Sequence, residues 1–458
     1  MLTRLEVDGF KNLLGFTVEF GPFTCIAGAN AVGKSNLFDA IEFLSLLADH
    51  KLNEAASKIR AVPGAMGTGR ELFWTNGVER APTMSFAAEM IVDGLVFDEL
   101  AGQPIAPIGT LLRYELELGY ENGQASRIPR LVIVRERLEL LGDADRIRFP
   151  RHPSFGETQH LGAASGRVVF DGASGFGFSP GRNPELGIAQ RTVVSVPEAT
   201  AERTTTLAAR QEMRAWRRIA LEPTAIAEPD GFGAPRFMST EGRHLPTVLR
   251  ALDGHVVNEG IDYHLEDGRD AYGDIAMRLS AITPIRSIEV DSDEERGTYA
   301  LRVELQSGEK VPARALSAGT LRFLALAVLA RDGHGLSCIE EPENGIHPFQ
   351  IRDLVEILRE LATDSTLAFE PVDDGTPRLQ QVIVNTHSPP LVKEIYQENP
   401  EDILLATRAT IRRPDGGAAQ TLRLHPLLGT WRCSEEFRGI GPLLLAPYVG
   451  GAIRKEHE

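Results

Sequence analysis

The chain has 458 residues, a formal net charge of −16, 42% hydrophobic residues and 24% charged residues. This composition is ordinary for a globular protein and argues against a largely disordered or fibrous chain. No apolar run reaches the ~18 residues of a membrane-spanning helix. The 3 cysteines lie too far apart in the sequence to form a paired-cysteine zinc unit. We therefore expect a cytoplasmic protein with no membrane contact. Its negative charge disfavours a surface coated for nucleic acid, although a local basic groove remains compatible with it.

The first forty residues predict three strands, a loop and a helix. Residues 5–7 and 16–20 alternate apolar and polar side chains, and residues 23–27 form a short apolar run typical of a buried strand. From Ser35 onward, apolar residues recur at helical spacing. A loop with two glycines therefore lies between a buried strand and an amphipathic helix.

That loop carries the pattern G-x-x-x-x-G-K-[ST], as GANAVGKS at residues 28–35. Its glycines let backbone N–H groups converge on phosphates, Lys34 brings a positive charge to the β- and γ-phosphates, and Ser35 can ligate Mg²⁺. The sequence therefore predicts a P-loop that binds ATP and Mg²⁺. The residues expected to bind the nucleotide in this segment are Gly28, Asn30, Gly33, Lys34, Ser35 and Asn36.

The rest of the chain predicts a nucleotide-binding α/β fold split by a large insertion of β-hairpins and helices. Strands are expected at 84–90, 114–118, 131–134 (after a turn at 122–123), 299–305, 336–339 and 381–384, and helices at 201–221, 245–252, 272–282, 321–330 and 351–362. The predicted domains are 1–100 (first part of the nucleotide-binding head), 101–305 (insertion), 306–400 (second part of the head) and 401–458 (a C-terminal segment that could contact a partner).

Two carboxylates, Glu340 and Glu341, follow the apolar strand at 336–339. A carboxylate at a strand end can hold Mg²⁺ through water, and its neighbour can polarise the attacking water. We assign the metal role to Glu340, together with Ser35, and the water-activating role to Glu341.

Two further segments bear on phosphate chemistry. The string LSAGT at 316–320 precedes a helix, so that Ser317, Gly319 and the helix N-terminus can form an anion site. His387 follows the strand at 381–384 and could contact the γ-phosphate.

Taken in order, these motifs resemble the ABC-type ATPase heads of the SMC/RecF/OLD group. The string IEEPENGIHP at 339–348 resembles in particular the OLD-like AAA ATPases of bacterial antiphage defence, such as PARIS-like or Septu-like systems. The resemblance covers residues 1–45 and about 310–395. It implies a head-to-tail homo-oligomer, at least a dimer, in which Ser317 and Gly319 of one protomer contact the nucleotide held by Lys34 of another. It also makes 342–347 the D-loop and His387 the H-switch.

The sequence departs from that family in two places. ABC heads carry a Q-loop glutamine after the P-loop helix, whereas the first glutamine after Lys34 is Gln103, in an irregular context. Either another residue orients Mg²⁺ and water, or the fold brings Gln103 in, and turnover is expected to be slow. OLD nucleases also carry a Toprim domain, and the ~70 residues that follow His387 are too few for one.

A stripe of arginines in the insertion is the candidate DNA contact. Arg203, Arg210, Arg214 and Arg217 fall near one face of the helix expected at 201–221, with Arg218 adjoining. Such a stripe suits phosphate contacts. A solvated face paired with Glu202, Glu212 or a partner's acids is the favoured interpretation.

Three hypotheses follow. The first is an ATP-hydrolysing switch that controls a separate effector, a nuclease or a toxin, in defence against phage or other mobile DNA. The second is a RecF-like ATPase of DNA repair that binds DNA directly. The third is a scaffold that binds ATP to assemble and does not hydrolyse it.

Overall fold

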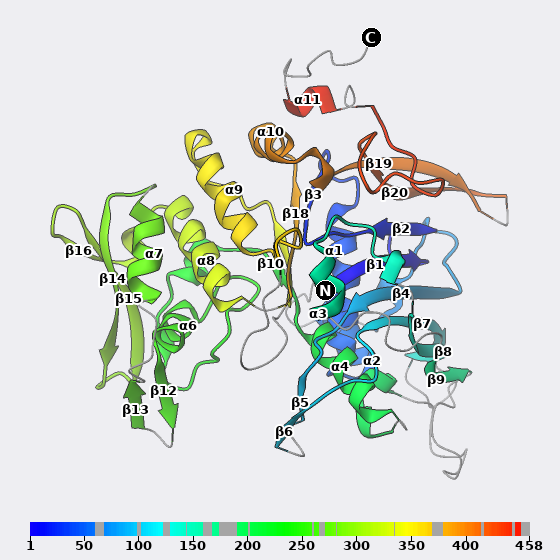
Figure 1. The fold of residues 1–458 in the computed structure, drawn as a ribbon, viewed down its shortest axis with the longest axis horizontal. Helices are drawn as coiled ribbons and strands as arrows, with labels where there is room; N and C mark the ends of the chain where they lie inside the picture. The colour runs from blue at the N-terminus through cyan, green and yellow to red at the C-terminus, as the bar shows by residue number, and fades with distance from the viewer. Residues whose placement is uncertain are drawn as a thin grey trace. The chain divides into compact units, whose positions relative to one another are not determined.

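The computed structural model describes residues 1–59, 68–98, 102–121, 129–142, 144–158, 167–173, 190–199, 202–258, 261–264, 271–280, 282–333, 335–368, 379–413, 416–441 and 445–449. The fold is α/β, as predicted (Figure 1). The chain divides into two compact units, and each is assembled from separate stretches of sequence. Unit 1 contains Met1–Arg217, Thr363–Gln381 and Glu401–Pro442, and unit 2 contains Arg218–Ala362, Val382–Pro400 and Leu443–Glu458. The domain bounds expected at residues 100, 305 and 400 remain predictions.

An antiparallel sheet forms much of unit 1. In spatial order its strands are β2 (Phe16–Glu19), β1 (Leu2–Asp8), β4 (Thr83–Ile91), β7 (Leu111–Glu121), β8 (Arg130–Leu140) and β9 (Val168–Ala173). The predicted pairing of 114–118 with 131–134 is confirmed, with Leu118 opposite Ile133. The turn expected at 122–123 lies outside the described residues. One face of this sheet is apolar because alternate side chains along each strand are buried.

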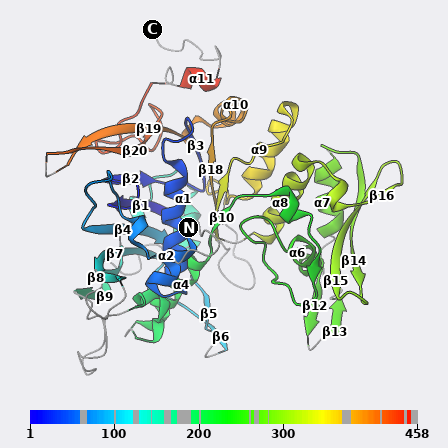
Figure 2. The ribbon, with the colours of Figure 1, turned by 180° about the vertical axis from the view of Figure 1, so that it is seen from behind.

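Helix α1 (Lys34–Leu47) packs on that apolar face, in front of β1 and β4 in Figure 2. The ring of Phe43 on α1 lies 5.8 Å from Phe86 on β4 and 6.1 Å from Phe10, which follows β1. All three rings are buried. Since aromatic burial and edge-to-face contacts contribute strongly to a core, this cluster fixes the helix that begins at the P-loop lysine.

A second group of unit 1 strands continues from the P-loop strand. Strand β3 (Phe23–Ala27) pairs in parallel with β19 (Ile403–Arg412), and β19 forms an antiparallel hairpin with β20 (Ala418–Pro426). Ile403 lies opposite Cys25, so β19 runs alongside the strand that enters the P-loop. The remaining described helices and strands of unit 1 are α2 (Leu52–Lys58), β5 (Val96–Asp98), β6 (Gln103–Ile105), α3 (Pro153–Thr158) and α4 (Arg203–Arg214).

The prediction of one helix over 201–221 is wrong for the second half of that segment. Helix α4 ends at Arg214, and β10 (Trp216–Ile219) follows it as a strand, hydrogen-bonded beside β17. Trp216 and Ile219 are buried, while the two arginines between them are half-buried. The periodic arginines mimicked a helix, but burial of the aromatic and β-branched ends of the segment favours the sheet.

The strands that carry the acidic motif lie in unit 2, where β10, β17 (Gly335–Glu340) and β18 (Gln380–Thr386) are hydrogen-bonded in that order. A smaller antiparallel sheet joins β11 (Asp230–Gly231), β15 (Thr298–Leu305) and β14 (Ile285–Asp293), with β16 (Lys310–Pro312) also paired to β15, and β12 (His255–Asn258) pairs with β13 (Ile261–His264). The helices are α5 (Pro223–Ile226), α6 (Leu245–Leu252), α7 (Ala271–Ser280), α8 (Ala318–Asp332), α9 (Ile351–Glu360), α10 (Pro389–Glu398) and α11 (Ala446–Val449).

Helix α8 is the buried helix of unit 2. It contacts α6, α7 and α9, and α7, α8 and α9 lie side by side in both views (Figures 1 and 2). Its apolar, alanine-rich sequence suits burial on several sides. Among the described helices of the whole chain, none has the length and apolar character needed to cross a membrane.

Candidate functional site

The P-loop has the predicted context, since β3 ends at Ala27 and α1 begins at Lys34. The Lys34 side chain curls back over the loop, and its Nζ atom donates to the carbonyl oxygens of Gly28 at 2.5 Å and Ala29 at 2.9 Å. Lys34 is only 6% exposed. The loop thus holds its ammonium group within the phosphate-binding turn, where a P-loop lysine acts.

Both P-loop glycines are required by packing. A Cβ atom at Gly28 would lie 2.8 Å from the Cβ of Ala406 on β19. Gly33 has a φ of 108°, and a Cβ atom there would overlap the side chain of Asn12. Only glycine combines that backbone angle with so close a neighbour.

Two side chains that the sequence analysis missed hold the P-loop. Asn12 Nδ2 donates to the carbonyl of Val32 at 3.2 Å, and Asn36 Nδ2 donates to Asn12 Oδ1 at 2.7 Å. Arg408, on the part of β19 that extends past the loop, donates to the carbonyl of Ala31, whose φ is 63°. No local pattern identifies Asn12 or Arg408, because each reaches the loop through tertiary structure.

The other predicted P-loop residues differ in exposure. Asn30 is exposed and Ser35 is half-buried at the start of α1. The Asn36 amide is engaged by Asn12, so in this structure it stabilises the loop conformation.

In unit 2, the structure brings Glu341 and His387 together at the ends of β17 and β18. His387 Nδ1 lies 2.8 Å from Glu341 Oε1, and Asn344 Nδ2 donates to Glu341 Oε2 at 2.9 Å. Glu341 has a φ of 44°, which is rare for a residue with a side chain, and its N–H donates to the carbonyl of Asn385 at 3.0 Å. Such backbone outliers cluster at functional sites, where the surrounding contacts hold them in place.

A buried carboxyl supports this pair from behind. Glu343 is 8% exposed and accepts a hydrogen bond at Oε1 from the hydroxyl of Thr386, the residue before His387. Burial raises the pKa of Glu343 above its ordinary value, and the neighbouring Glu341 adds to that rise. Glu343 thereby ties the segment after β17 to the end of β18.

Ser317 and Gly319 lie at the N-terminus of α8. Ser317 is the N-cap, and its hydroxyl accepts a hydrogen bond from the N–H of Thr320 at 3.1 Å. A Cβ atom at Gly319 would overlap the carbonyl oxygen of Gly345, and Arg322 Nη1 donates to the carbonyl of Asn344 at 2.5 Å. The predicted signature and D-loop segments of one chain are therefore packed against each other.

Glu340, the predicted metal residue, has an arginine partner. Arg218 on β10 donates to Glu340 Oε1 from Nε at 2.8 Å and from Nη2 at 2.7 Å. Carboxylate and hydroxyl oxygens such as those of Glu340 and Ser35 are hard ligands of the kind Mg²⁺ prefers. No cluster of three or more His, Cys, Asp or Glu that could hold a metal ion occurs in the described part of the chain. Ser35 in unit 1 and Glu340 in unit 2 are thus each, taken separately, of the side-chain type that suits a Mg²⁺ ion coordinated largely by phosphates and water.

The arginine stripe is largely paired with acids of its own chain. Arg203 binds Asp98, while Arg210 and Arg214 both bind Asp49, at 3.0 Å and 2.8 Å. The arginines are therefore paired with acidic residues, as predicted, but these acids are Asp98 and Asp49 and not the expected Glu202 and Glu212. Glu202 binds Arg167, and Glu212 accepts from Trp216 Nε1 at 2.8 Å.

Gln103, the first glutamine after Lys34, has no contact in the described structure that would identify it as the Q-loop glutamine. It lies exposed at the start of β6, opposite Asp98 of β5. Its backbone environment is a short two-stranded ribbon in unit 1.

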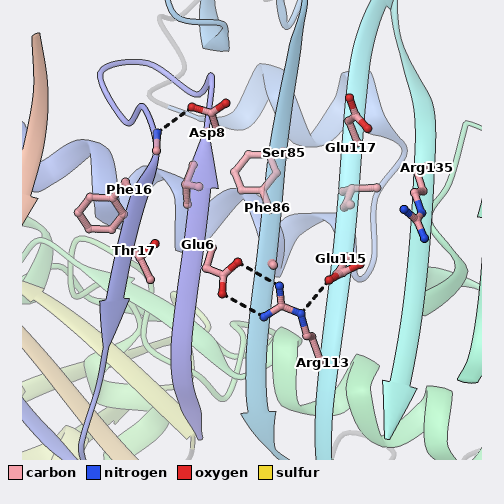
Figure 3. A pocket seen from close by; sticks show the side chains of 14 residues that line it. Glu6, Asp8, Phe16, Thr17, Ser85, Phe86, Arg113, Glu115, Glu117 and Arg135 are labelled. Atoms are coloured by element: carbon pink, nitrogen blue, oxygen red, sulfur yellow. Dashed lines mark hydrogen bonds and ion pairs between the residues drawn. The ribbon is translucent and has the colours of Figure 1, made fainter. Parts of the chain in front are cut away.

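A pocket of about 400 Å³ lies on the polar face of the antiparallel sheet of unit 1 (Figure 3). Across it, Arg113 bridges Glu6 at 3.0 Å and Glu115 at 2.8 Å. None of the predicted site residues lines this pocket. Four carboxylates and two arginines line it, so its charge is negative overall and does not suit a phosphate, and we assign it no role in nucleotide binding.

Comparison with known proteins supports an ATPase domain. Residues 226–393 match the family described as "AAA domain, putative AbiEii toxin, Type IV TA system". The match contains Ser317, both motif carboxylates and His387, while the P-loop lies outside it. It supports an AAA domain in this part of the chain. No curated protein matches the chain.

Several solved structures are similar in fold. An SMC head bound to the C-winged helix domain of ScpA has 13% identity and a TM-score of 0.47, with coverage of 92% of this chain and 98% of that chain. The SMC head domain of Thermotoga maritima has 11% identity and a TM-score of 0.37, with coverage of 92% and 98%. A Pyrococcus furiosus SMC head with an extended coiled coil, bound to the C-terminal domain of ScpA, has 12% identity and a TM-score of 0.41, with coverage of 92% and 96%.

Proposed function

We propose that the chain is an ABC-type ATPase that converts ATP to ADP and phosphate and uses the nucleotide state as a switch. In this proposal Lys34 and the loop N–H groups bind the phosphates, and Ser35 and Glu340 hold Mg²⁺. When bound there, Mg²⁺ would supply positive charge against the phosphates. Glu341 accepts a proton from the attacking water, and His387 holds Glu341 in position.

The Glu341–His387 pair is the observation that carries the proposal. A general base must be fixed within hydrogen-bonding reach of its proton, and Glu341 is held at both oxygens, by His387 at 2.8 Å and by Asn344 at 2.9 Å. A surface acid whose role was only to cap a turn would not need an unusual φ and a partner on the next strand. This pair favours hydrolysis over a scaffold that only binds ATP.

We also propose head-to-tail assembly, with Ser317 and Gly319 of one protomer meeting the nucleotide on the P-loop of another. The N-terminus of α8 supports this role, because a helix start with a serine hydroxyl and free N–H groups suits a phosphate. The assembly would place one chain's signature segment at its partner's active site.

The controlled partner is proposed to be a separate effector, a nuclease or a toxin, in defence against phage or other mobile DNA. The support is the resemblance of IEEPENGIHP to OLD-like defence ATPases, together with the description of the matched family, which names a toxin–antitoxin system. Direct DNA binding has less support, since Arg203, Arg210 and Arg214 are already paired with acids.

Measured ATP turnover and assembly test the proposal. Lys34→Ala should abolish nucleotide binding. Glu341→Gln should keep binding and lose at least about 100-fold in turnover, because water activation alone is removed. Glu341→Gln should also accumulate an ATP-bound dimer or larger ring in size-exclusion chromatography with light scattering. Lys393→Ala and Glu356→Gln, on the exposed faces of α10 and α9, are the matched controls.

Affinity purification with co-expressed genomic neighbours, with and without ATP, tests effector control. A stoichiometric partner that is retained or released according to nucleotide supports the switch. A chain that purifies alone and binds DNA when ATP is present supports the repair function instead.

In the turnover experiment, a Glu341→Gln variant that hydrolyses ATP as fast as the wild type would refute the hydrolytic mechanism.

A further inference from the structure

The contact between Arg218 and Glu340 joins two neighbouring strands of unit 2. Arg218 lies on β10 and Glu340 ends β17. Their side chains are 15% and 21% exposed. The pair is therefore shielded from most solvent, where a charge-assisted hydrogen bond is stronger than at an open surface.

The geometry of the contact is one-sided. Two nitrogen atoms of the Arg218 guanidinium group, Nε at 2.8 Å and Nη2 at 2.7 Å, donate to the same oxygen, Oε1 of Glu340. The described contacts include no hydrogen bond to Oε2 of Glu340. One oxygen is thus held by two donors, and the other remains for a water molecule in a metal's shell.

Glutamate needs such a restraint more than aspartate does. It has one more rotatable bond, and ordering that bond costs additional conformational entropy. Outer partners that orient metal-binding carboxylates commonly change metal affinity by about 10–100-fold.

We propose that Arg218 is a positioning residue that fixes the Glu340 carboxylate, leaving Oε2 available so that the carboxylate would be oriented to hold Mg²⁺ when the ion is bound. The inference rests on the proposed function of the same site. It assigns Arg218, which adjoins the arginine stripe considered as a candidate DNA contact, to the metal side of the ATPase site. The glutamate at position 340 and the arginine at 218 act as a unit.

Metal binding tests this role without relying on turnover. The full-length protein is saturated with a non-hydrolysable ATP analogue, and Mn²⁺ binding is titrated by electron paramagnetic resonance. A fluorescent ATP analogue, titrated in EDTA, reports metal-free nucleotide binding. The variants are Arg218→Ala and Arg218→Lys. The control is Arg243→Ala, which removes a more exposed Arg–Glu pair with Glu228 in the same unit.

Arg218→Ala should weaken Mn²⁺ binding about 10–100-fold and leave metal-free nucleotide affinity within about threefold. The Mn²⁺ affinity of Arg218→Lys should lie between those of Arg218→Ala and the wild type, since one ammonium group cannot reproduce the two donors of the guanidinium group. Arg243→Ala should match the wild type in both titrations. If Arg218→Ala does not fold, judged by circular dichroism, Arg218→Lys carries the test.

Glu340→Asp adds an independent measurement. The shorter acid withdraws from Arg218, so its effect and that of Arg218→Lys on Mn²⁺ affinity should be less than additive. Additive effects, or equal or tighter Mn²⁺ binding by the Arg218 variants, would overturn the positioning role. A wild-type protein that binds no nucleotide overturns the proposed function itself, whereas intact binding with insensitive Arg218 variants overturns only this inference.

Discussion

The side chain of Asn12 packs so closely against Gly33 that it fills the space a Cβ atom would need there: such an atom would lie 2.8 Å from Oδ1 of Asn12. The asparagine follows the first strand of the chain, and the glycine precedes the P-loop lysine. Their contact, together with the hydrogen bond from Asn12 to the carbonyl of Val32, fixes the second half of the loop. The P-loop conformation thus depends on a residue outside its motif.

Asn12→Ala should weaken nucleotide binding about tenfold, or about 1.4 kcal/mol. The variant loses the bonds to Val32 and Asn36, so the loop must be ordered when the phosphates bind. A fluorescent ATP analogue measures the affinity, and thermal unfolding checks the fold. Asn76→Ala, which removes the cap of an exposed turn in the same unit, should keep full affinity. Unchanged nucleotide affinity of a folded Asn12→Ala variant would show that the P-loop does not depend on Asn12.

Two substitutions of Ser317 can distinguish its structural role, as the N-cap of α8, from its proposed role in binding nucleotide. Ser317→Ala should lower the free energy of unfolding by about 1 kcal/mol, because the N-cap bond to Thr320 is lost. Ser317→Asp keeps a good N-cap but adds a negative charge that opposes a phosphate. Both variants should lose ATP-dependent assembly in light scattering, and only Ser317→Ala should lose stability. Normal assembly by Ser317→Asp would remove the nucleotide role and leave Ser317 as a cap.

Glu136 predicts a pH dependence of stability in unit 1. Burial raises its pKa to about 7, although Tyr114 Oη and the N–H of Val193 each donate to Oε1 at 2.7 Å. Below pH 4.5 the carboxyl is protonated in both the folded and the unfolded state. As the pH rises from 4.5 to 7 the unfolded chain ionises first, so stability falls, and the loss levels off above pH 7 at about 3 kcal/mol.

Glu136→Gln stays neutral and keeps an oxygen for both donors. Its free energy of unfolding, relative to the wild type, should therefore rise between pH 5 and pH 7 and then level off. Urea unfolding at pH 5, 6, 7 and 8 measures the difference. Asn76→Ala, which changes no titratable group, is the control and should show a flat difference. A flat difference for Glu136→Gln would show that the buried carboxyl does not titrate in this range.

Local sequence signals predicted much of the fold. The β3–loop–α1 unit follows from an apolar run, two glycines and a helical repeat, all within residues 23–47. The helix expected at 245–252 is α6, with Pro246 in its first turn, where the missing N–H is harmless. The motif carboxylates were placed correctly at the end of a strand for the same reason. Each of these features is encoded within one short segment.

Tertiary contacts explain what the sequence left out. Asn12 reaches the P-loop from the turn after β1 and Arg408 reaches it from β19, and no spacing rule connects positions 12, 31 and 408. The turn from α4 into β10 was missed because arginines at helical spacing continued past Arg214. Arg218 therefore emerged as a partner of Glu340 only when β10 and β17 were paired in space.

His387→Ala should separate catalysis from binding. The variant removes the partner of Glu341 Oε1 but leaves Asn344 on Oε2, so the carboxylate remains in place with one restraint fewer. We expect turnover to fall about 100-fold while the affinity for ATP stays within about threefold. Steady-state phosphate release and equilibrium titration of a fluorescent ATP analogue measure the two quantities. His425→Ala on β20, which removes a histidine bonded to Thr407 at 2.9 Å, is the matched control and should leave turnover unchanged. Turnover within threefold of the wild type would mean that Glu341 needs no help from His387, and the bond between them would then be structural alone.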